Sequence, residues 1–306
     1  MYEFKKNIYL NCNDYYEEWS FGISLQSNTQ FEFLDCYYTF YRGNLGHEEE
    51  MLSVSYYNND NHKNIAEKKI EMSLKTLTYL FLIPLYTDSF TKENEVRNIP
   101  KQIRSGSKIK VDKLEKISNR IKKFKKTRQL FDEVILIFNA GIKFSCMNNF
   151  MEDSFLNYFK IVEKICKFDY EIRKDEIRKE LNTVENQGQL RLYLNKFLCE
   201  NFHIEYSSNK IDDLTGNVTG VFLKNIQQDV FSKVMIYCKK NDILINADRL
   251  GKTINIRNMI AHGEIVDIKN YLKEFSYINH ICLNIISKKF FDSKYDDIRI
   301  ECKVDI

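Results

Sequence analysis

Proline and glycine are scarce in this chain of 306 residues, which has two prolines and ten glycines. All-β proteins use both residues at their many turns, so the composition argues against an all-β fold. Hydrophobic residues make up 43% of the chain and aromatic residues 14%, which is typical of a globular protein and not of a disordered one. We therefore expect long helices over most of the sequence.

Motifs for metals and nucleotides are missing as well. The eight cysteines form no C-x-x-C pair, which argues against a zinc site. The sequence contains no Walker A loop, no G-x-G-x-x-G turn, no G-x-S-x-G elbow and no H-E-x-x-H helix. We expect a protein that needs neither a metal nor a cofactor.

No apolar run has the length of a signal peptide core or of a membrane span. The most apolar run, residues 74–86, is interrupted by Lys75 and Pro84 and is too short to cross a bilayer. The cysteine spacing fits free thiols in a reducing compartment better than a disulfide framework. The sequence therefore predicts a cytoplasmic protein without membrane contact.

The N-terminal part of the chain has the pattern of a small α+β domain. Residues 1–60 alternate apolar and polar side chains or carry aromatic and β-branched runs, which is typical of strands. Residues 63–83 follow with helical periodicity and end before Pro84. We expect an antiparallel sheet and a helix within residues 1–100. Its many aromatic side chains either pack the sheet, which we favour, or stack on bases.

Basic side chains are concentrated in residues 101–128, which we expect to form a linker followed by a helix. Twelve Lys and Arg residues in this tract oppose only Asp112 and Glu115. Such a tract is either a solvated helix face or a surface for the phosphate backbone of a nucleic acid. Its densest part supplies the candidate RNA-binding residues Lys122, Lys123, Lys125 and Lys126.

Residues 129–306 have a helical pattern throughout and are predicted to form one C-terminal helical domain. Two stretches lack this periodicity and contain turn-prone residues, which predicts loops at 182–188 and 207–220. The expected fold is therefore mainly α, with a small α+β domain before a helical bundle.

One predicted helix, within residues 250–266, carries an arginine, an amide and an imidazole. At 100° per residue, Arg257, Asn258 and His262 fall on the arc opposite Ile256 and Ile260. Asn258 and His262 are four residues apart, so their side chains can touch. This polar face is either a catalytic site or a structural pair at an interface.

The motif resembles the R-x(4–6)-H motif of the HEPN superfamily, in the order Arg257-Asn258-Met259-Ile260-Ala261-His262. Residues 154–165 are similar to the early helix of ApeA-like HEPN domains, including a glutamate at Glu163. The resemblance covers about residues 130 to 292. It implies that the C-terminal bundle is of the HEPN type.

The resemblance also implies a homodimer, because HEPN nucleases bring the motif helices of two copies together in a composite site. Aliphatic side chains on the arc of Arg257 support such a contact independently. The predicted interface residues are Leu250, Ile254, Ala261 and Ile265.

The function implied by the resemblance is metal-independent endoribonuclease activity, with Arg257, Asn258 and His262 as catalytic residues. An imidazole suits proton abstraction from a ribose 2′-hydroxyl, and a guanidinium suits the charge that develops on the phosphate. The implied partners are RNA such as tRNA or mRNA, and an antitoxin or a phage-derived trigger. The implied role is that of a toxin or abortive-infection effector in anti-phage defence. The alternative is a catalytically inactive HEPN-like module for dimerisation and binding.

Overall fold

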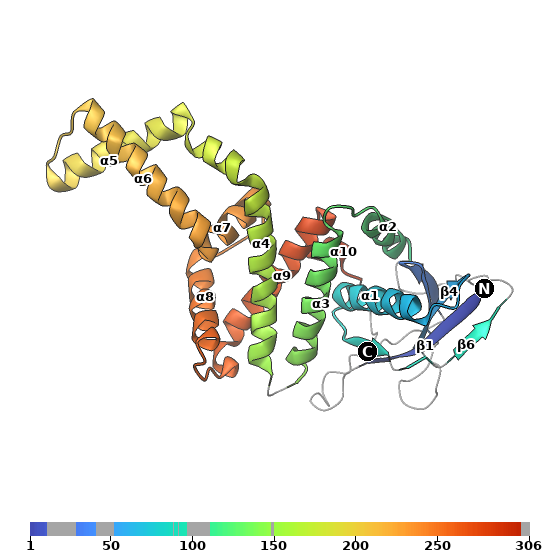
Figure 1. The fold of residues 1–306 in the computed structure, drawn as a ribbon. Coiled ribbons are helices and arrows are strands. Elements are labelled where there is room, and N and C mark those ends of the chain that lie inside the picture. Colours follow the sequence, from blue (N-terminus) through green and yellow to red (C-terminus); the bar gives the residue numbers. More distant parts are fainter. Residues whose placement is uncertain are drawn as a thin grey trace. The chain divides into compact units, whose positions relative to one another are not determined.

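The computed structural model describes residues 1–10, 29–40, 52–87, 89–90, 92–96, 111–147 and 150–300. The chain divides into two compact units (Figure 1). The first unit comprises Met1–Ile161 and Arg257–Ile306, and the second unit comprises Val162–Ile256. The fold is mainly helical with an antiparallel sheet near the N-terminus, as the sequence predicts. Among the described residues, no helix is both long and apolar enough to cross a membrane.

The sheet of the first unit is built from short antiparallel strands. Its strand order is β2-β3-β4-β1-β5, and β6 also pairs with β1. The strands are β1 (Tyr2–Leu10), β2 (Thr29–Phe33), β3 (Cys36–Phe40), β4 (Leu52–Asn58), β5 (Leu85–Thr87) and β6 (Lys92–Glu95).

The turn between β2 and β3 is anchored by the following helix. Phe33 pairs with Cys36, and the two residues between them, Leu34 and Asp35, have φ angles of 50° and 66°. Left-handed backbone costs a non-glycine residue about 1–2 kcal/mol. Two contacts offset this cost, because the Leu34 side chain is buried and its N–H donates to Ser118 Oγ at 3.1 Å. Ser118 lies on helix α2 (Val111–Lys122).

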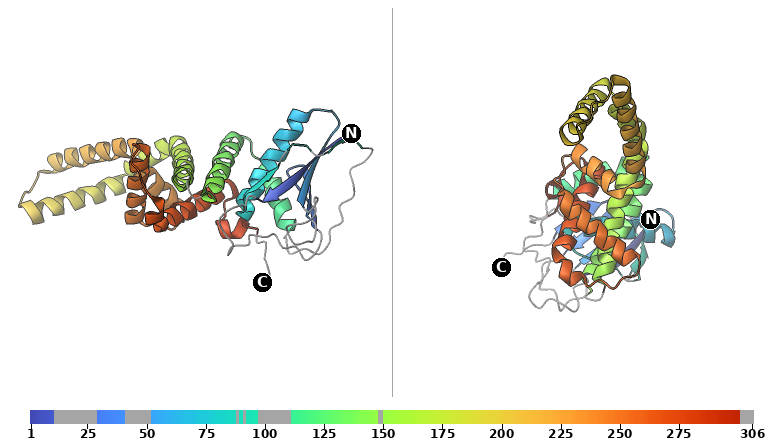
Figure 2. Two further views of the ribbon diagram at one scale, coloured as in Figure 1. Left: turned by 90° about the horizontal axis from the view of Figure 1, so that it is seen from below. Right: turned by 90° about the vertical axis from the view of Figure 1, so that its left-hand side faces the viewer.

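Helix α1 (Lys63–Phe81) packs against the sheet and against helix α3 (Arg128–Ser145), as Figure 2 shows. On the sheet side, the buried Tyr38 hydroxyl donates to Ser73 Oγ at 2.7 Å. On the α3 side, the rings of Tyr79 and Phe138 meet edge to face with centres 5.2 Å apart. The sheet, α1 and α3 therefore share one core.

The C-terminal helices return to this core. They are η1 (Ile268–Tyr271), α9 (Leu272–Phe291) and α10 (Tyr295–Ile298). Phe290 of α9 packs on Phe131 of α3 with ring centres 5.0 Å apart, and the Tyr295 hydroxyl donates to the Tyr79 carbonyl at 2.8 Å. The boundary predicted at residue 129 therefore does not separate a sheet domain from a helical domain. Residues 101–110, the expected linker, lie outside the described residues.

The second unit is entirely helical in its described residues. It contains the C-terminal part of α4 (Met151–Leu181), then α5 (Val184–Phe202), α6 (Ser208–Gln228) and α7 (Val230–Lys240), and the start of α8 (Ala247–Ala261). Tyr170, Ile177 and Ile226 form a small buried core, against which Leu181 and Ile236 pack.

The loop predicted at residues 207–220 is wrong, because α6 runs through it. Gly216 and Gly220 produced that prediction, but both lie on the exposed side of α6, and a Cβ at either position would meet nothing within 4 Å. Helix α6 ends instead just before Asp229. The carboxylate of Asp229 accepts hydrogen bonds from the N–H groups of Phe231 and Ser232 and caps α7.

Candidate functional site

Helix α8 carries the arginine and the amide of the motif, and a glycine ends it directly after the histidine. Gly263 has a φ of +81°. Its N–H donates to the Ile260 carbonyl, and the N–H of Glu264 donates to the Met259 carbonyl, both at 3.0 Å. This pair of bonds with a left-handed glycine is the Schellman arrangement. His262 is therefore the C-cap residue of α8 and not part of its interior.

The guanidinium of Arg257 is half-buried and held by two contacts within the first unit. Its Nη1 donates to Asn258 Oδ1 at 3.0 Å. Its Cζ lies 5.5 Å from the centre of the Phe159 ring, which is 1% exposed on α4. A cation over an aromatic face contributes about 0.5–2 kcal/mol, with the larger value in desolvated places. These contacts restrict the guanidinium to a small range of positions.

Phe159 is a site residue that the sequence does not reveal. The sequence pattern places it in a core stripe of its own helix, and burial there is what the structure shows. Its second role, as the surface under Arg257, joins residues far apart along the chain. No local spacing encodes such a contact.

His262 is exposed to solvent, in contrast to Arg257 and Asn258, which are half-buried. Among the described residues, no hydrogen bond joins the side chains of Asn258 and His262. The amide carbonyl of Asn258 instead accepts from Arg257. Asn258 therefore orients the arginine, while the imidazole is exposed at the end of the helix.

The predicted interface residues differ in exposure. Leu250 is fully buried and cannot contribute to a surface, so this part of the prediction is wrong. Ile254 is half-buried, Ala261 is exposed, and Ile265 is 99% exposed beyond the end of α8. Leu250 and Arg257 are seven residues apart and differ by only about 20° on a straight helix. The side of α8 that carries Arg257 is therefore partly turned into the protein.

The predicted RNA-binding lysines lie at the end of α2 and in the turn before α3. Lys122 pairs with Asp35 at 2.6 Å and with Glu32 at 3.7 Å. Burial alone would lower the pKa of Lys122, but its hydrogen bond to Asp35 and the charge of that carboxylate outweigh this and raise the pKa. Lys122 therefore stabilises the turn between β2 and β3. Lys123, Lys125 and Lys126 are exposed, and their role in RNA binding stays a prediction.

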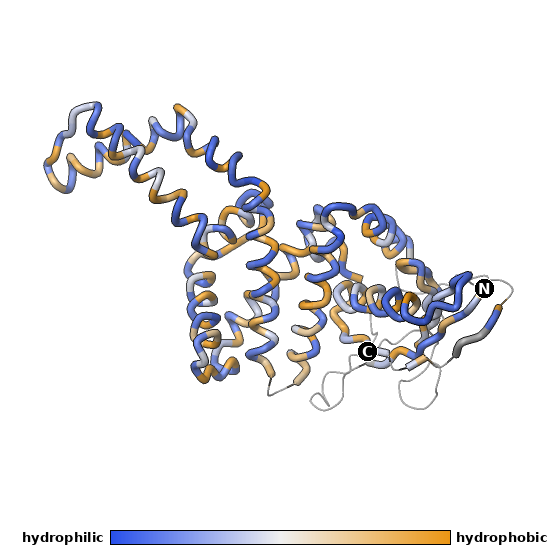
Figure 3. The backbone as a smooth tube through the Cα atoms, in the orientation of Figure 1, coloured by the Kyte–Doolittle hydropathy of each residue, from blue (hydrophilic) through white to orange (hydrophobic). Residues whose placement is uncertain are grey.

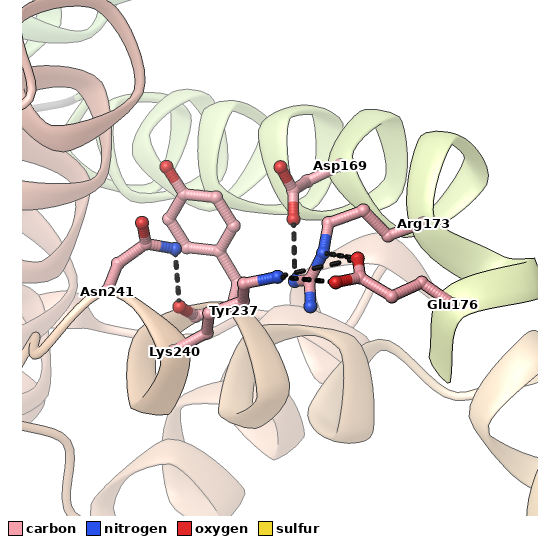
Figure 4. Close-up of polar contacts among 6 residues, drawn as sticks. All are labelled: Asp169, Arg173, Glu176, Tyr237, Lys240 and Asn241. Atoms are coloured by element: carbon pink, nitrogen blue, oxygen red, sulfur yellow. Dashed lines mark hydrogen bonds and ion pairs between the residues drawn. The ribbon is translucent and has the colours of Figure 1, made fainter. Parts of the chain in front are cut away.

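A second charged cluster, in the second unit, joins α4 to α7 (Figure 4). Arg173 donates from Nε to Glu176 at 2.7 Å and lies 3.4 Å from Asp169. Lys240 of α7 reaches the same Glu176 carboxylate at 3.4 Å. The hydrogen bond from Arg173, together with that from Lys240, lowers the pKa of Glu176. The charges compensate one another across two helices, which fits a structural role.

Metal-binding geometry is absent from the part of the chain that the structure describes, where no three His, Cys, Asp or Glu side chains are grouped to hold an ion. No family model matches the chain, and neither does any curated protein or solved structure. The geometry of the motif is therefore the feature of this chain that bears on its function.

Proposed function

We propose that this protein is a metal-independent endoribonuclease of the HEPN type that cleaves RNA with Arg257 and His262. The observation that supports this most is that a restrained guanidinium and an exposed imidazole lie five residues apart at the end of the same helix. Preorganised charge beside a group that can move a proton is the minimum that phosphodiester transesterification requires.

The proposed reaction uses the ribose of the substrate as the nucleophile. His262 accepts the proton of the 2′-hydroxyl, the 2′-oxygen attacks the phosphorus, and the bond from phosphorus to the 5′-oxygen breaks. A protonated imidazole returns a proton to the leaving 5′-oxygen. Arg257 stabilises the negative charge on the phosphate oxygens. The products are a 2′,3′-cyclic phosphate and a 5′-hydroxyl end.

The site is proposed to be composite, with the motif helices of two copies facing each other. Ala261 and the exposed Ile265 remain available for that contact, and the half-buried Ile254 adds to its edge. A two-fold contact supplies two guanidinium groups and two imidazoles to one RNA strand. The proposed role is that of a toxin or abortive-infection effector acting on cellular RNA.

The second candidate is an inactive helical module that binds a partner. It is favoured by the bonds of Arg257 themselves, because an arginine stacked on Phe159 and bonded to Asn258 is also a stabilising structural residue. In that case Arg257 would contribute to folding and not to chemistry.

Incubation of the purified chain with total RNA in EDTA, followed by sequencing of the ends, separates the two candidates. We expect cleavage with 5′-hydroxyl ends, and a loss of about 10²-fold or more in His262→Ala, which removes the proton acceptor. Because His262 is exposed, the free energy of unfolding of the variant should lie within about 0.5 kcal/mol of that of the wild type. A folded His262→Ala protein that cleaves at the wild-type rate would contradict the proposal, as would RNA that stays intact with the wild type.

A further inference from the structure

Helix α9 connects the motif to the basic turn between α2 and α3, and all of these elements lie in the first unit. Near the beginning of α9, Phe275 packs on Tyr158 of α4 with ring centres 5.9 Å apart. Tyr158 directly precedes Phe159, the ring that lies under Arg257. The start of α9 and the motif therefore contact adjacent residues of α4.

The other end of α9 lies against the basic turn. The ring of Phe124 in this turn packs on Phe290 and Phe291 of α9, with ring centres 5.8 Å and 6.3 Å apart. Phe124 stands between Lys123 and Lys125, so its ring holds these two exposed lysines at the end of α9. Helix α9 rises about 22 Å from Phe275 to Phe290, which separates the motif from the turn by about that length.

The solvent side of α9 carries a continuous line of polar side chains, which can be followed by hydropathy in Figure 3. They follow one another at spacings of three or four residues, which places them within about 80° of the helix circumference. This polar line of α9 consists of Lys273, Tyr277, His280, Asn284 and Lys288. Each of them is exposed or half-buried, whereas Ile278, Cys282 and Ile286 on the opposite side are fully buried.

The polar line leads directly to the basic turn. One turn beyond Lys288, Phe291 falls on the same side of α9, and this is the ring that Phe124 covers. In the middle of the line, the side chains of His280 and Asn284 lie 3.2 Å apart, between Nε2 and Nδ2. The line therefore continues without an interruption from the motif end of α9 to the lysines of the turn.

Positive charge borders the polar line along its length. Lys273 lies at the motif end of the line and Lys288 at the turn end. The exposed Lys294 lies beside the line, because the next residue, Tyr295, donates its N–H to Asn284 Oδ1 at 3.4 Å. Lysines spaced along one surface neutralise successive phosphates of a nucleic acid backbone.

The nearby carboxylates lie outside the polar line. In α9, which the structure describes in full, the one acidic residue is Glu274, about 100° around the helix from Lys273. Asp292 follows the helix and pairs with Lys288 at 2.9 Å. Asp296 and Asp297 are exposed on α10. These groups limit the width of the basic surface, which fits one backbone better than two.

We propose that the polar line of α9 is the path of a single RNA strand that runs from the motif to the basic turn. The identity of the ligand rests on the proposed function. One row of side chains matches one backbone, and the half-buried Tyr277 offers a ring on which an unpaired base can stack. At the 3.4 Å spacing of stacked nucleotides, about 22 Å corresponds to about six or seven nucleotides. The substrate is therefore RNA with an unpaired segment of about that length beside the cleaved bond.

Filter binding of oligouridines to the full-length chain tests this path. The His262→Ala background keeps the RNA intact during the measurement. We expect an oligomer of about 12 nucleotides to bind about tenfold more tightly than one of about 4 nucleotides, because only the longer one spans both ends. Lys273→Glu and Lys294→Glu should each weaken binding of the longer oligomer and flatten its log–log salt dependence by about 0.7.

The middle of the path is tested at His280, where the two ends of α9 alone would predict no effect. His280→Glu places a carboxylate beside the strand and should weaken binding, whereas His280→Gln keeps a neutral hydrogen-bonding side chain and should not. Lys68→Glu, at an exposed position on α1, is the matched control for the two lysine reversals and should bind normally. All substituted side chains are exposed, so the thermal unfolding midpoint should stay the same.

The outcomes separate the path from the nuclease proposal. Unchanged binding of the longer oligomer by Lys273→Glu, His280→Glu and Lys294→Glu overturns the path, and so does an equal loss in Lys68→Glu. Cleavage is measured separately in EDTA with His262 intact. A chain that binds along the polar line but leaves RNA uncut keeps the path and contradicts the nuclease. A chain that cuts RNA while the three variants bind normally has the opposite meaning.

Discussion

The Arg257 guanidinium lies over the Phe159 ring, with 5.5 Å between Cζ and the ring centre. The ring is fixed in the core of the first unit, so it limits how the arginine can move. A guanidinium that is already oriented loses less freedom when it binds a phosphate. The same contact serves stability and, in the proposed reaction, the binding of the scissile phosphate.

Arg257→Lys tests whether shape or charge matters at this position. Lysine keeps the charge but lacks the planar fork, so it stacks less well on Phe159 and offers no matched pair of donors. We expect the free energy of unfolding to fall by about 1 kcal/mol. The cleavage rate should fall by more than the loss of folded protein accounts for, because the paired donors to the phosphate are lost. Thermal unfolding and an initial-rate assay on the same preparation measure both. Wild-type cleavage by the lysine variant would show that the fork is dispensable.

Ile265→Asp tests the composite site. The side chain is 99% exposed, so the substitution should not change the free energy of unfolding. In the proposed pairing of motif helices, two carboxylates would face each other across the seam, which opposes the approach of the two sites. We expect cleavage to fall and association, measured by sedimentation, to weaken. Full activity in this variant would show that cleavage does not need the contact between the motif helices.

The exposed lysines of the α2–α3 turn should contribute RNA affinity. Reversing Lys123, Lys125 and Lys126 to glutamate should weaken binding and flatten its salt dependence by about 0.7 per lost phosphate contact in a log–log plot. Filter binding at several salt concentrations gives the slope. The turnover of bound RNA should change much less than the affinity.

A matched control separates local binding from overall charge. Lys68, Lys143 and Lys160 are also exposed in the first unit but lie on three different helices. Reversing these three changes the net charge by the same amount. If this control weakens binding as much as the turn variant, the turn is not a binding site.

Gly263→Ala should show that the helix end positions His262. Alanine at a φ of +81° is strained by about 1–2 kcal/mol, although nothing within 4 Å would clash with its Cβ. We expect lower stability and reduced cleavage. Gly251→Ala in the same helix is the control, because its φ is helical and its Cβ site is open, so stability should rise by up to about 1 kcal/mol. Equal effects at the two positions would contradict the role given to Gly263.

The Asp229 carboxyl should make the free energy of unfolding depend on pH. Burial alone would raise the pKa of this carboxyl, but hydrogen bonds from Ser232 and Phe231 outweigh it, so the pKa is lowered in the folded state. The stabilisation is therefore present above the ordinary aspartate pKa of about 4 and is lost as the pH falls toward the lowered folded value. Chemical denaturation from pH 7 to pH 3 should show a smaller loss of stability for Asp229→Asn than for the wild type. Parallel curves would exclude this contribution.

Periodicity and turn composition were enough to predict the mainly helical fold and the antiparallel sheet. The same rules failed at α6, because glycines on an exposed helix side look like loop residues in the sequence. They also failed at Leu250, because its burial depends on which side of α8 faces the rest of the chain. A helical wheel shows which residues share a side of a helix, but not whether that side faces the rest of the protein or the solvent.

Part of the candidate site could be predicted from the sequence. Arg257, Asn258 and His262 share a helix, so spacing alone groups them. Their differences arise from distant contacts and from the helix end, which place Arg257 on Phe159 and leave His262 exposed. Nothing local in the sequence indicates that Asn258 would bond the arginine before it in preference to the histidine.

The anchored turn between β2 and β3 limits how the protein can be dissected. An isolated two-stranded hairpin such as β2–β3 is marginal by itself in water. Here the Leu34 N–H depends on Ser118, and Asp35 depends on Lys122, both of which lie beyond residue 100. A fragment that ends at residue 100 would keep the ion pair of Asp35 with Lys69, but the left-handed turn would lose Ser118 and Lys122, and Tyr79 would lose the ring of Phe138. The N-terminal sheet is thus not a transferable module, and its activities have to be tested within the intact chain.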